Sequence, residues 1–279
     1  MFLNVLMVLL SPFLSKFIYV NGYDNEQANT CVYLSGAAYC GKENYETMVL
    51  AGPASGFVYK ETLYDINTDL QGYIGYLSSK KTIYVALRGS SSALNWLDDF
   101  EIRLVDYVTW PTCGCKVHNG FYKSAQGVTN RTLETVKILK KRFPTYKVVM
   151  TGHSYGASTA QLLGMELEKN GINVEIYNYG QPRVGESKYA GFVNTVIEDY
   201  WRFTHNRDIV PHVPPIVGLG YLHSCREVFE DETGKMRLCS EADCEDPTCA
   251  DQYSISETNV DDHSYYLGHR IDCEHSTVG

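Results

Sequence analysis

The stretch that decides the fold runs from Tyr146 to Lys169 and reads YKVVMTGHSYGASTAQLLGMELEK. Its first part, 148–150, is a short apolar run rich in valine, which is typical of a strand buried on both faces. After the turn, apolar residues recur at positions 157, 160, 162, 163 and 167, a spacing that predicts an amphipathic helix. The stretch therefore predicts a strand, a tight turn and a helix, in that order.

The turn itself, GHSYG at 152–156, has glycine on both sides of a serine. Glycines here let the strand and the helix backbones approach closely, while Ser154 sits in a strained turn with its hydroxyl exposed. This arrangement is the nucleophile elbow of the α/β-hydrolase fold. We interpret Ser154 as a catalytic nucleophile, the alternative being an ordinary glycine-rich turn between a strand and a helix.

The rest of the chain alternates between the same kinds of element. Strands are predicted at 56–60, 71–79 and 81–89, with the last two forming a hairpin. A helix at 128–142 precedes the elbow strand, and a strand at 173–179, a helix at 187–197 and a strand at 200–205 follow the elbow helix. Alternation from residue 128 onward predicts a mostly parallel central sheet flanked by helices, with antiparallel strands at its front edge.

The first twenty residues differ from the remainder. Residues 2–20 are almost wholly apolar, but Pro12 and Lys16 interrupt them, so the uninterrupted run is shorter than the about 20 residues that a membrane span needs. We interpret residues 1–22 as a secretory signal peptide, with a transmembrane anchor as the alternative. Residues 23–279 show no linker or repeat and are expected to form one domain, secreted and without a transmembrane segment.

Composition narrows the function classes. The formal charge is -9 and no basic cluster is present, which argues against nucleic acid as a partner. Nine cysteines in a secreted chain predict disulfides, and their odd number leaves at least one free or paired outside the chain. Their spacings do not predict a zinc site, so no metal or other cofactor is expected. Asn130 begins an Asn-Arg-Thr sequon and is a candidate glycosylation site.

A serine hydroxyl needs a histidine base that is oriented by a carboxylate, and in this fold the chain order is Ser, Asp or Glu, His. Asp208 directly follows the predicted strand at 200–205, the alternative for it being an Asx-turn. His263 lies on a long polar loop that could reach back over the strand ends, whereas His269, close to Cys273, suits a structural role. The other histidines after the elbow are His212, His223 and His275.

An oxyanion hole requires two preorganised N–H donors. One is expected from Tyr155, the residue after the nucleophile. The second should come from a loop after an early strand, and Ser90 occupies that position in the sequence Arg88-Gly89-Ser90. The alternative is an ordinary flexible turn at this place.

Six segments together resemble the fungal-type class 3 lipases, which are also called triacylglycerol lipase-like. They are LRGSSSALNWLDDF (87–100), VHNGFY (117–122), VVMTGHSYGA (148–157), YNYGQPRVG (177–185), THNRDIVPHVPP (204–215) and DDHSYYLG (261–268). The resemblance covers roughly residues 35–273. The cysteine-rich part at 225–249 is more similar to secreted animal members than to fungal ones.

This resemblance implies an α/β-hydrolase fold with Ser154, Asp208 and His263 as the triad. It also implies an oxyanion hole from the N–H groups of Ser90 and Tyr155. Residues 91–100 correspond to a short lid helix, whose apolar residues are Leu94, Trp96 and Leu97. A disulfide between Cys40 and Cys273 is likewise implied by the family pattern, whereas the pairing of the other seven cysteines is left open.

The chain departs from the family pattern at three places. Tyr155 and Ala157 replace the usual Leu and Gly of the elbow, which implies a narrower or more polar acyl groove. Cys113-Gly114-Cys115 is one residue shorter than the family's C-x-x-C. Two lid aspartates, Asp98 and Asp99, add charge where a strongly interfacial lipase would carry apolar surface.

The expected function is that of a secreted, monomeric serine hydrolase that cleaves carboxylic esters of lipids through an acyl-enzyme on Ser154. Its substrate would be met at an oil-water or membrane interface. One alternative is a feruloyl-esterase-like or other soluble carboxylesterase. Another, of a different class, is a lipid-binding relative without catalysis.

Overall fold

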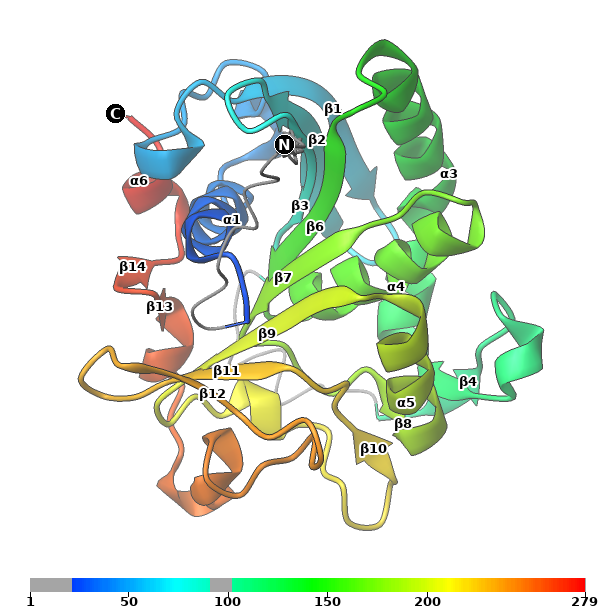
Figure 1. Cartoon of the computed structure of the whole chain (residues 1–279), viewed down its shortest axis with the longest axis vertical. Helices are drawn as coiled ribbons and strands as arrows, with labels where there is room; N and C mark the ends of the chain where they lie inside the picture. Colours follow the sequence, from blue (N-terminus) through cyan, green and yellow to red (C-terminus); the bar gives the residue numbers. More distant parts are fainter. Residues whose placement is uncertain (1–21, 91–101, 279) are drawn as a thin grey trace, which may run out of the picture.

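The computed structural model describes residues 22–90 and 102–278, and its centre is an eight-stranded sheet (Figure 1). The strand order is β1-β2-β3-β6-β7-β9-β11-β12, and the five strands from β3 to β11 are parallel. The predicted mostly parallel sheet with antiparallel strands at its front edge is confirmed. Its strands are β1 (Val58–Asp65), β2 (Leu70–Leu77), β3 (Thr82–Leu87), β6 (Lys147–His153), β7 (Glu175–Tyr179), β9 (Asp199–His205), β11 (Glu227–Glu230) and β12 (Met236–Leu238).

Helices cover both faces of this sheet. Helix α1 (Asn25–Ala37) packs on one face, and α3 (Asn119–Arg142), α4 (Tyr155–Lys169) and α5 (Ser187–Val196) lie on the opposite side (Figure 1). Helix α3 begins well before the predicted residue 128. Its start is set by the His118 side chain, which accepts a hydrogen bond from the Phe121 N–H at 3.2 Å, and apolar periodicity does not reveal such a cap. The short α6 (Cys273–Ser276) packs beside α1.

A second, smaller sheet has the order β10-β8-β5-β4 and packs beside α5 and the start of α3. Its members are β4 (Leu104–Asp106), β5 (Lys116–His118), β8 (Gly185–Glu186) and β10 (Tyr221–Leu222). The strands β13 (Tyr265–Tyr266) and β14 (His269–Arg270) pair near the C-terminus. The 3₁₀ turns are η1 (Lys42–Asn44), η2 (Gly52–Ala54), η3 (Pro111–Cys113), η4 (Val210–His212), η5 (Ala250–Gln252), η6 (Ile255–Glu257) and η7 (Asp261–Ser264).

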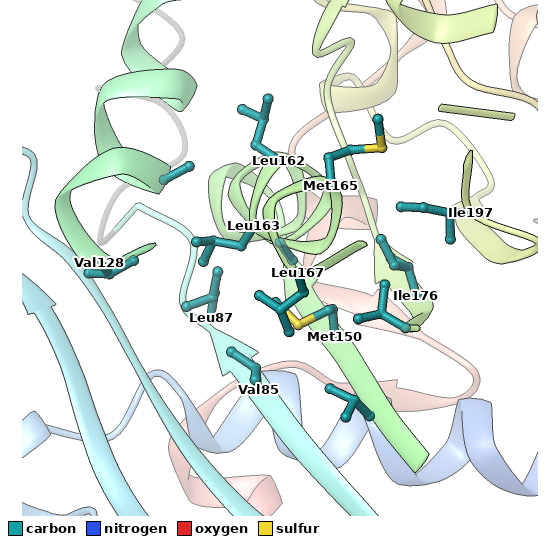
Figure 2. Close-up of a cluster of buried hydrophobic side chains, with 14 of the residues drawn as sticks. Val85, Leu87, Val128, Met150, Leu162, Leu163, Met165, Leu167, Ile176 and Ile197 are labelled. Atoms are coloured by element: carbon teal, nitrogen blue, oxygen red, sulfur yellow. The ribbon is translucent and has the colours of Figure 1, made fainter. Parts of the chain in front are cut away.

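The core has two parts because the side chains of each strand alternate between the two faces. On β3, Val85 and Leu87 join the cluster beneath α4, whereas Tyr84 and Ala86 join the cluster beneath α1. Figure 2 shows Leu163 and Leu167 of α4 directed at the strand side chains of the first cluster. The central strands are therefore buried on both faces, which is why their sequences are continuous apolar runs.

Eight of the nine cysteines form disulfides, and Cys31 is buried and unpaired. Cys40 is bonded to Cys273, which joins the end of α1 to the C-terminal segment. The remaining bridges are Cys113–Cys115, Cys225–Cys244 and Cys239–Cys249. The shortened C-x-C spacing is thus bonded here, and the last two bridges organise the polar segment that follows β11.

Two predicted segments lie outside the described residues: the signal peptide up to residue 21, and the lid at 91–100 with Leu94, Trp96 and Leu97. Within residues 22–90 and 102–278, every helix is too short or too polar to cross a bilayer.

Candidate active site

Ser154 lies between β6 and α4, where the structure has the predicted turn. It is the residue before the first turn of α4, and its backbone has φ 58° and ψ -129°. A serine in this left-handed region is strained, which is typical of functional turns. Its N–H donates to the Tyr179 carbonyl at 2.9 Å, so the strained turn is fixed to the neighbouring strand β7.

The glycines around Ser154 allow close backbone approach. A Cβ atom on Gly152 would lie 2.5 Å from the carbonyl carbon of Gly156, so a side chain there would collide with the start of α4. A Cβ on Gly89 would lie 2.9 Å from the Cβ of Ser154. The loop after β3 therefore packs directly against the serine, and this contact requires glycine at position 89.

Asp208 and His263 meet at the carboxyl end of the parallel strands. Asp208 follows β9, and His263 lies in η7 on the late loop that returns over the strand ends. The Nδ1 of His263 donates to the Oδ2 of Asp208 at 2.8 Å, and both side chains are buried. Gly180, at the end of β7, faces this imidazole, because a Cβ there would lie 2.7 Å from His263 Cε1. The structure thus brings the two predicted residues into contact.

Asp208 is held as a carboxylate by its surroundings. Its Oδ1 accepts the Val210 N–H at 2.8 Å, and its Oδ2 accepts the Tyr266 hydroxyl in addition to His263. Burial raises the pKa of Asp208, but the charge of His263 and these hydrogen bonds lower it more strongly, so the pKa lies below its usual range. A buried ionised carboxylate beside an imidazole fixes the Nδ1–H tautomer and leaves Nε2 as the basic nitrogen.

The Nε2 atom of His263 is buried and has no hydrogen-bond partner among the described residues. The imidazole lies next to the elbow, because its ring centroid is 4.2 Å from that of His153, the residue before Ser154. A basic nitrogen at this place is suited to take the proton of a serine hydroxyl. Such contacts are often long in a protein without substrate and shorten in the reacting complex.

His153 connects three segments of the site. Its Nε2 lies 2.8 Å from the His263 carbonyl oxygen and must therefore donate, while its Nδ1 lies 2.7 Å from the Tyr39 hydroxyl and accepts. Burial lowers the pKa of His153 well below its usual value, and the charge of His263 lowers it further, so the ring is neutral. Tyr39 also contacts the backbone at Gly89, and the elbow, the histidine loop and the loop after β3 are thereby tied together.

The two predicted oxyanion donors lie on segments that meet at Ser154. The N–H of Tyr155 belongs to the first turn of α4, where the helix offers no acceptor of its own and its dipole is positive. Ser90 is half-buried and follows Gly89, the residue packed on Ser154. Arg88 anchors this loop through an ion pair of 2.7 Å between its Nη2 and Asp69 Oδ2.

The other histidines considered from the sequence have different partners. The Nε2 of His269 bonds the Ser276 hydroxyl at 3.0 Å, and its ring stacks on Tyr33. His223 Nε2 donates to the Pro211 carbonyl at 2.8 Å, and His275 Nδ1 bonds Asp272. His212 faces Asp251, with 3.4 Å between Nδ1 and Oδ1.

Sequence reasoning did not identify Tyr39, His153 or Tyr266 as members of the site. His153 lies inside the elbow pentapeptide, and Tyr266 lies three residues after His263. Their closeness in sequence to the predicted site residues could have identified both. Tyr39 could not be found this way because its link to His153 spans most of the first half of the chain.

Comparison with known proteins agrees with this geometry. Residues 84–218 match the sequence model of the family described as lipase (class 3). A lipase of Rhizomucor miehei is 37% identical over 207 residues, which are 72% of this chain and 56% of the relative. A secreted mono- and diacylglycerol lipase of Fusarium solani is 33% identical over 198 residues, 70% of this chain and 55% of that protein. The chain thus spans little more than half the length of these curated relatives.

Solved structures superpose on a larger share of the chain. The propeptide complex of the Rhizomucor miehei lipase superposes with a TM-score of 0.80 at 32% identity, covering 88% of this chain and 80% of that one. A triacylglycerol lipase whose catalytic centre is formed by a serine protease triad gives 0.81 at 32% identity, covering 88% of this chain and 95% of that chain. The predicted α/β-hydrolase fold is confirmed by these neighbours, and the chain belongs to the class 3 lipase family.

Proposed function

We propose that the protein is a serine hydrolase that cleaves the carboxylic esters of acylglycerols. The observation that carries the proposal is the buried pair of Asp208 and His263, joined at 2.8 Å next to the strained elbow of Ser154. The class 3 lipase relatives support the lipid ester as the substrate class.

In the acylation step, Ser154 Oγ attacks the ester carbonyl carbon while His263 Nε2 takes the hydroxyl proton. The carboxylate of Asp208 stabilises the imidazolium that forms, through the bond to Nδ1. The N–H groups of Tyr155 and Ser90 are the proposed donors to the oxyanion of the tetrahedral intermediate. His263 then returns the proton to the leaving glycerol oxygen, and the acyl group remains on Ser154.

Deacylation repeats the same sequence with water as the nucleophile. His263 removes a proton from water, the hydroxide oxygen attacks the acyl carbon, and the fatty acid leaves as Ser154 regains its proton. All the proposed groups come from one chain, so we propose that a monomer is sufficient for turnover.

We also propose that the protein acts outside the cell, on substrate at an oil-water or membrane interface. Four disulfides support an oxidising compartment. The lid function of Leu94, Trp96 and Leu97 stays a proposal drawn from the sequence.

Glycosylation at Asn130 is constrained, because Asn130 lies within α3 and Thr132 is buried with its hydroxyl bonded to the Val128 carbonyl.

The test is hydrolysis of a triolein emulsion, a soluble short-chain ester and a feruloyl ester by the wild type and by Ser154→Ala. We expect hydrolysis of the emulsion at a rate that the serine variant lacks. Preference for the feruloyl ester would instead support the soluble esterase alternative. Lipid binding without turnover of any ester would support the non-catalytic alternative.

A further inference from the structure

The loop between η4 and β10, residues 213–220, exposes apolar side chains at its tip. Val217 is 89% exposed and Ile216 is 37% exposed. Single exposed apolar residues are ordinary on protein surfaces. Here two adjacent ones lie at the end of the same segment, and Figure 1 shows the yellow chain that leads into β10 projecting at the lower edge of the molecule. We call residues 213–220 the apolar loop.

The apolar loop belongs to a longer run without charge. Between Ile209 and Cys225 the sequence has no lysine, arginine, aspartate or glutamate, although the chain carries 24 basic and 33 acidic residues. Its two histidines do not add charge at neutral pH, because burial lowers the pKa of His212 and lowers that of His223 far below the usual value. The exposed part of this run, residues 215–218 and 220, is thus without charge in an acidic protein and is suited to a neutral, apolar phase.

The base of the apolar loop is held from below by a buried arginine. The N–H of Arg183 donates to the Val213 carbonyl at 2.9 Å, and its Nη1 donates to the Pro214 carbonyl at 3.0 Å. Arg183 is itself fixed by an ion pair of 2.8 Å with Glu245, and both side chains are nearly inaccessible to solvent. At the tip, the Gly220 N–H donates to the Ile216 carbonyl at 2.9 Å. A fixed base and a closed tip hold the two apolar side chains outward.

The apolar loop is also connected to the candidate active site. It begins five residues after Asp208, and η4 lies between them. At its other end, the Tyr221 hydroxyl donates to the carbonyl of Ile102 at 3.1 Å, and Ile102 is 43% exposed. This hydrogen bond fixes the end of the apolar loop to the segment that precedes β4.

We propose that the apolar loop docks the protein on the uncharged surface of an acylglycerol phase, with Ile216 and Val217 entering the lipid. The proposal rests on the proposed function, because it names the surface on which that ester is met. Transfer of apolar area from water gives about 25 cal/mol per Å², so two aliphatic side chains contribute enough to change partitioning measurably. Since the run carries no cation, attraction to anionic lipid is not expected to assist.

The experiment measures binding in the Ser154→Ala background, so that neither product formation nor loss of catalysis affects the result. Co-flotation with triolein emulsion droplets is compared for this protein, for the same protein with Ile216→Ser and Val217→Ser, and for it with Ile138→Ser. Ile138 is a matched control, because it is 68% exposed on α3. Val217→Asp is a further variant at the more exposed position, and thermal unfolding checks that each variant is folded.

We expect the double serine variant to bind droplets about tenfold more weakly than its parent. Val217→Asp should show a similar loss. The Ile138→Ser control should bind as its parent does, and salt should have little effect. Equal binding by all variants, or an equal loss in the Ile138→Ser control, would overturn the proposal. So would stronger binding to phosphatidylglycerol vesicles than to droplets, or a dimer in sedimentation that the loop substitutions dissociate. If droplet binding depended on the loop but the wild-type protein hydrolysed no ester, only the proposed function would be refuted.

Discussion

Tyr266 and His263 share one carboxylate oxygen: the phenol and the imidazole Nδ1 both donate to Oδ2 of Asp208. The three residues are buried, and Tyr266 belongs to the strand that directly follows η7. One short segment therefore supplies both the proposed base and a second donor to its carboxylate. This relationship gives the site a component that can be varied separately from the proposed triad.

Tyr266→Phe removes a hydrogen bond to a charged group while keeping the ring. Such a bond contributes about 1.5–3 kcal/mol, so kcat is expected to fall by roughly 10- to 100-fold if the bond persists in the transition state. The loss of a bond to the ionised form should also raise the pKa of Asp208. Steady-state kinetics against pH measures both effects. Tyr265→Phe, at an exposed neighbouring tyrosine, is the matched control and should leave kcat unchanged.

Asp208→Asn should reduce kcat by about 10⁴-fold, because an amide neither fixes the Nδ1–H tautomer nor stabilises the imidazolium. His263→Ala should cause a loss of similar size. His269→Ala, which removes a histidine bonded to Ser276, should retain activity at a temperature where the fold is intact. An inactive His269→Ala together with an active His263→Ala would transfer the role of the base to His269.

The chain sequence predicted the parallel sheet, the elbow and the meeting of Asp208 with His263, because each depends on local pattern or on the strand order. Apolar runs set the buried strands, and glycine at 152 and 156 set the tight turn. The contact of Tyr39 with His153 depends on α1 packing against β6, a long-range arrangement that local periodicity does not contain.

Strands β11 and β12 were also missed. They lie in a polar, cysteine-containing stretch, where β11 is short and carries Glu227 and Glu230. Both carboxylates are buried, and Glu227 is paired with Arg202 at 3.1 Å. In a sequence, a charged residue predicts an exposed position. Its burial is possible only because the fold supplies a partner for the charge.

Asp251 predicts a pH-dependent contribution to stability. Burial, and the nearby Glu245 charge, raise the pKa of Asp251 to about 6, against about 3.9 in an unfolded chain. Because the pKa is higher in the folded protein, protonation of Asp251 contributes fully to stability at a pH below its pKa in the unfolded chain. This contribution to the free energy of unfolding is lost as the pH rises through about 6. The effect of Asp251→Asn on the free energy of unfolding should therefore be more favourable at pH 8 than at pH 4. The difference should be about 1 kcal/mol, because the side chain is partly exposed and its charge is screened by solvent.

Denaturant unfolding of both proteins at pH 4 and pH 8 measures that difference. A variant that is equally destabilised at both values would mean that the contacts of Asp251 with Arg183 and His212 outweigh the cost of its charge.

The disulfide between Cys40 and Cys273 joins residues 233 positions apart in the chain. Replacing both cysteines with alanine should lower the free energy of unfolding by roughly 2–5 kcal/mol, chiefly because the unfolded chain gains freedom. Cys40 follows Tyr39, whose hydroxyl bonds His153 beside Ser154. Loss of the bridge should therefore reduce activity even where the variant is folded. Urea unfolding and activity at low temperature separate the two effects. An unchanged unfolding midpoint would contradict this account of the bridge.

The central claim is that Ser154 forms the covalent acyl-enzyme. Its most direct test is labelling of the folded protein with a fluorophosphonate, followed by peptide mapping by mass spectrometry. Ser158→Ala, in the helix that follows Ser154, is the control. We expect a single phosphonyl adduct on the peptide that contains Ser154, the same adduct in Ser158→Ala, and none in Ser154→Ala or in His263→Ala over the same time. An adduct at another residue, or equal labelling of the Ser154→Ala protein, would contradict it.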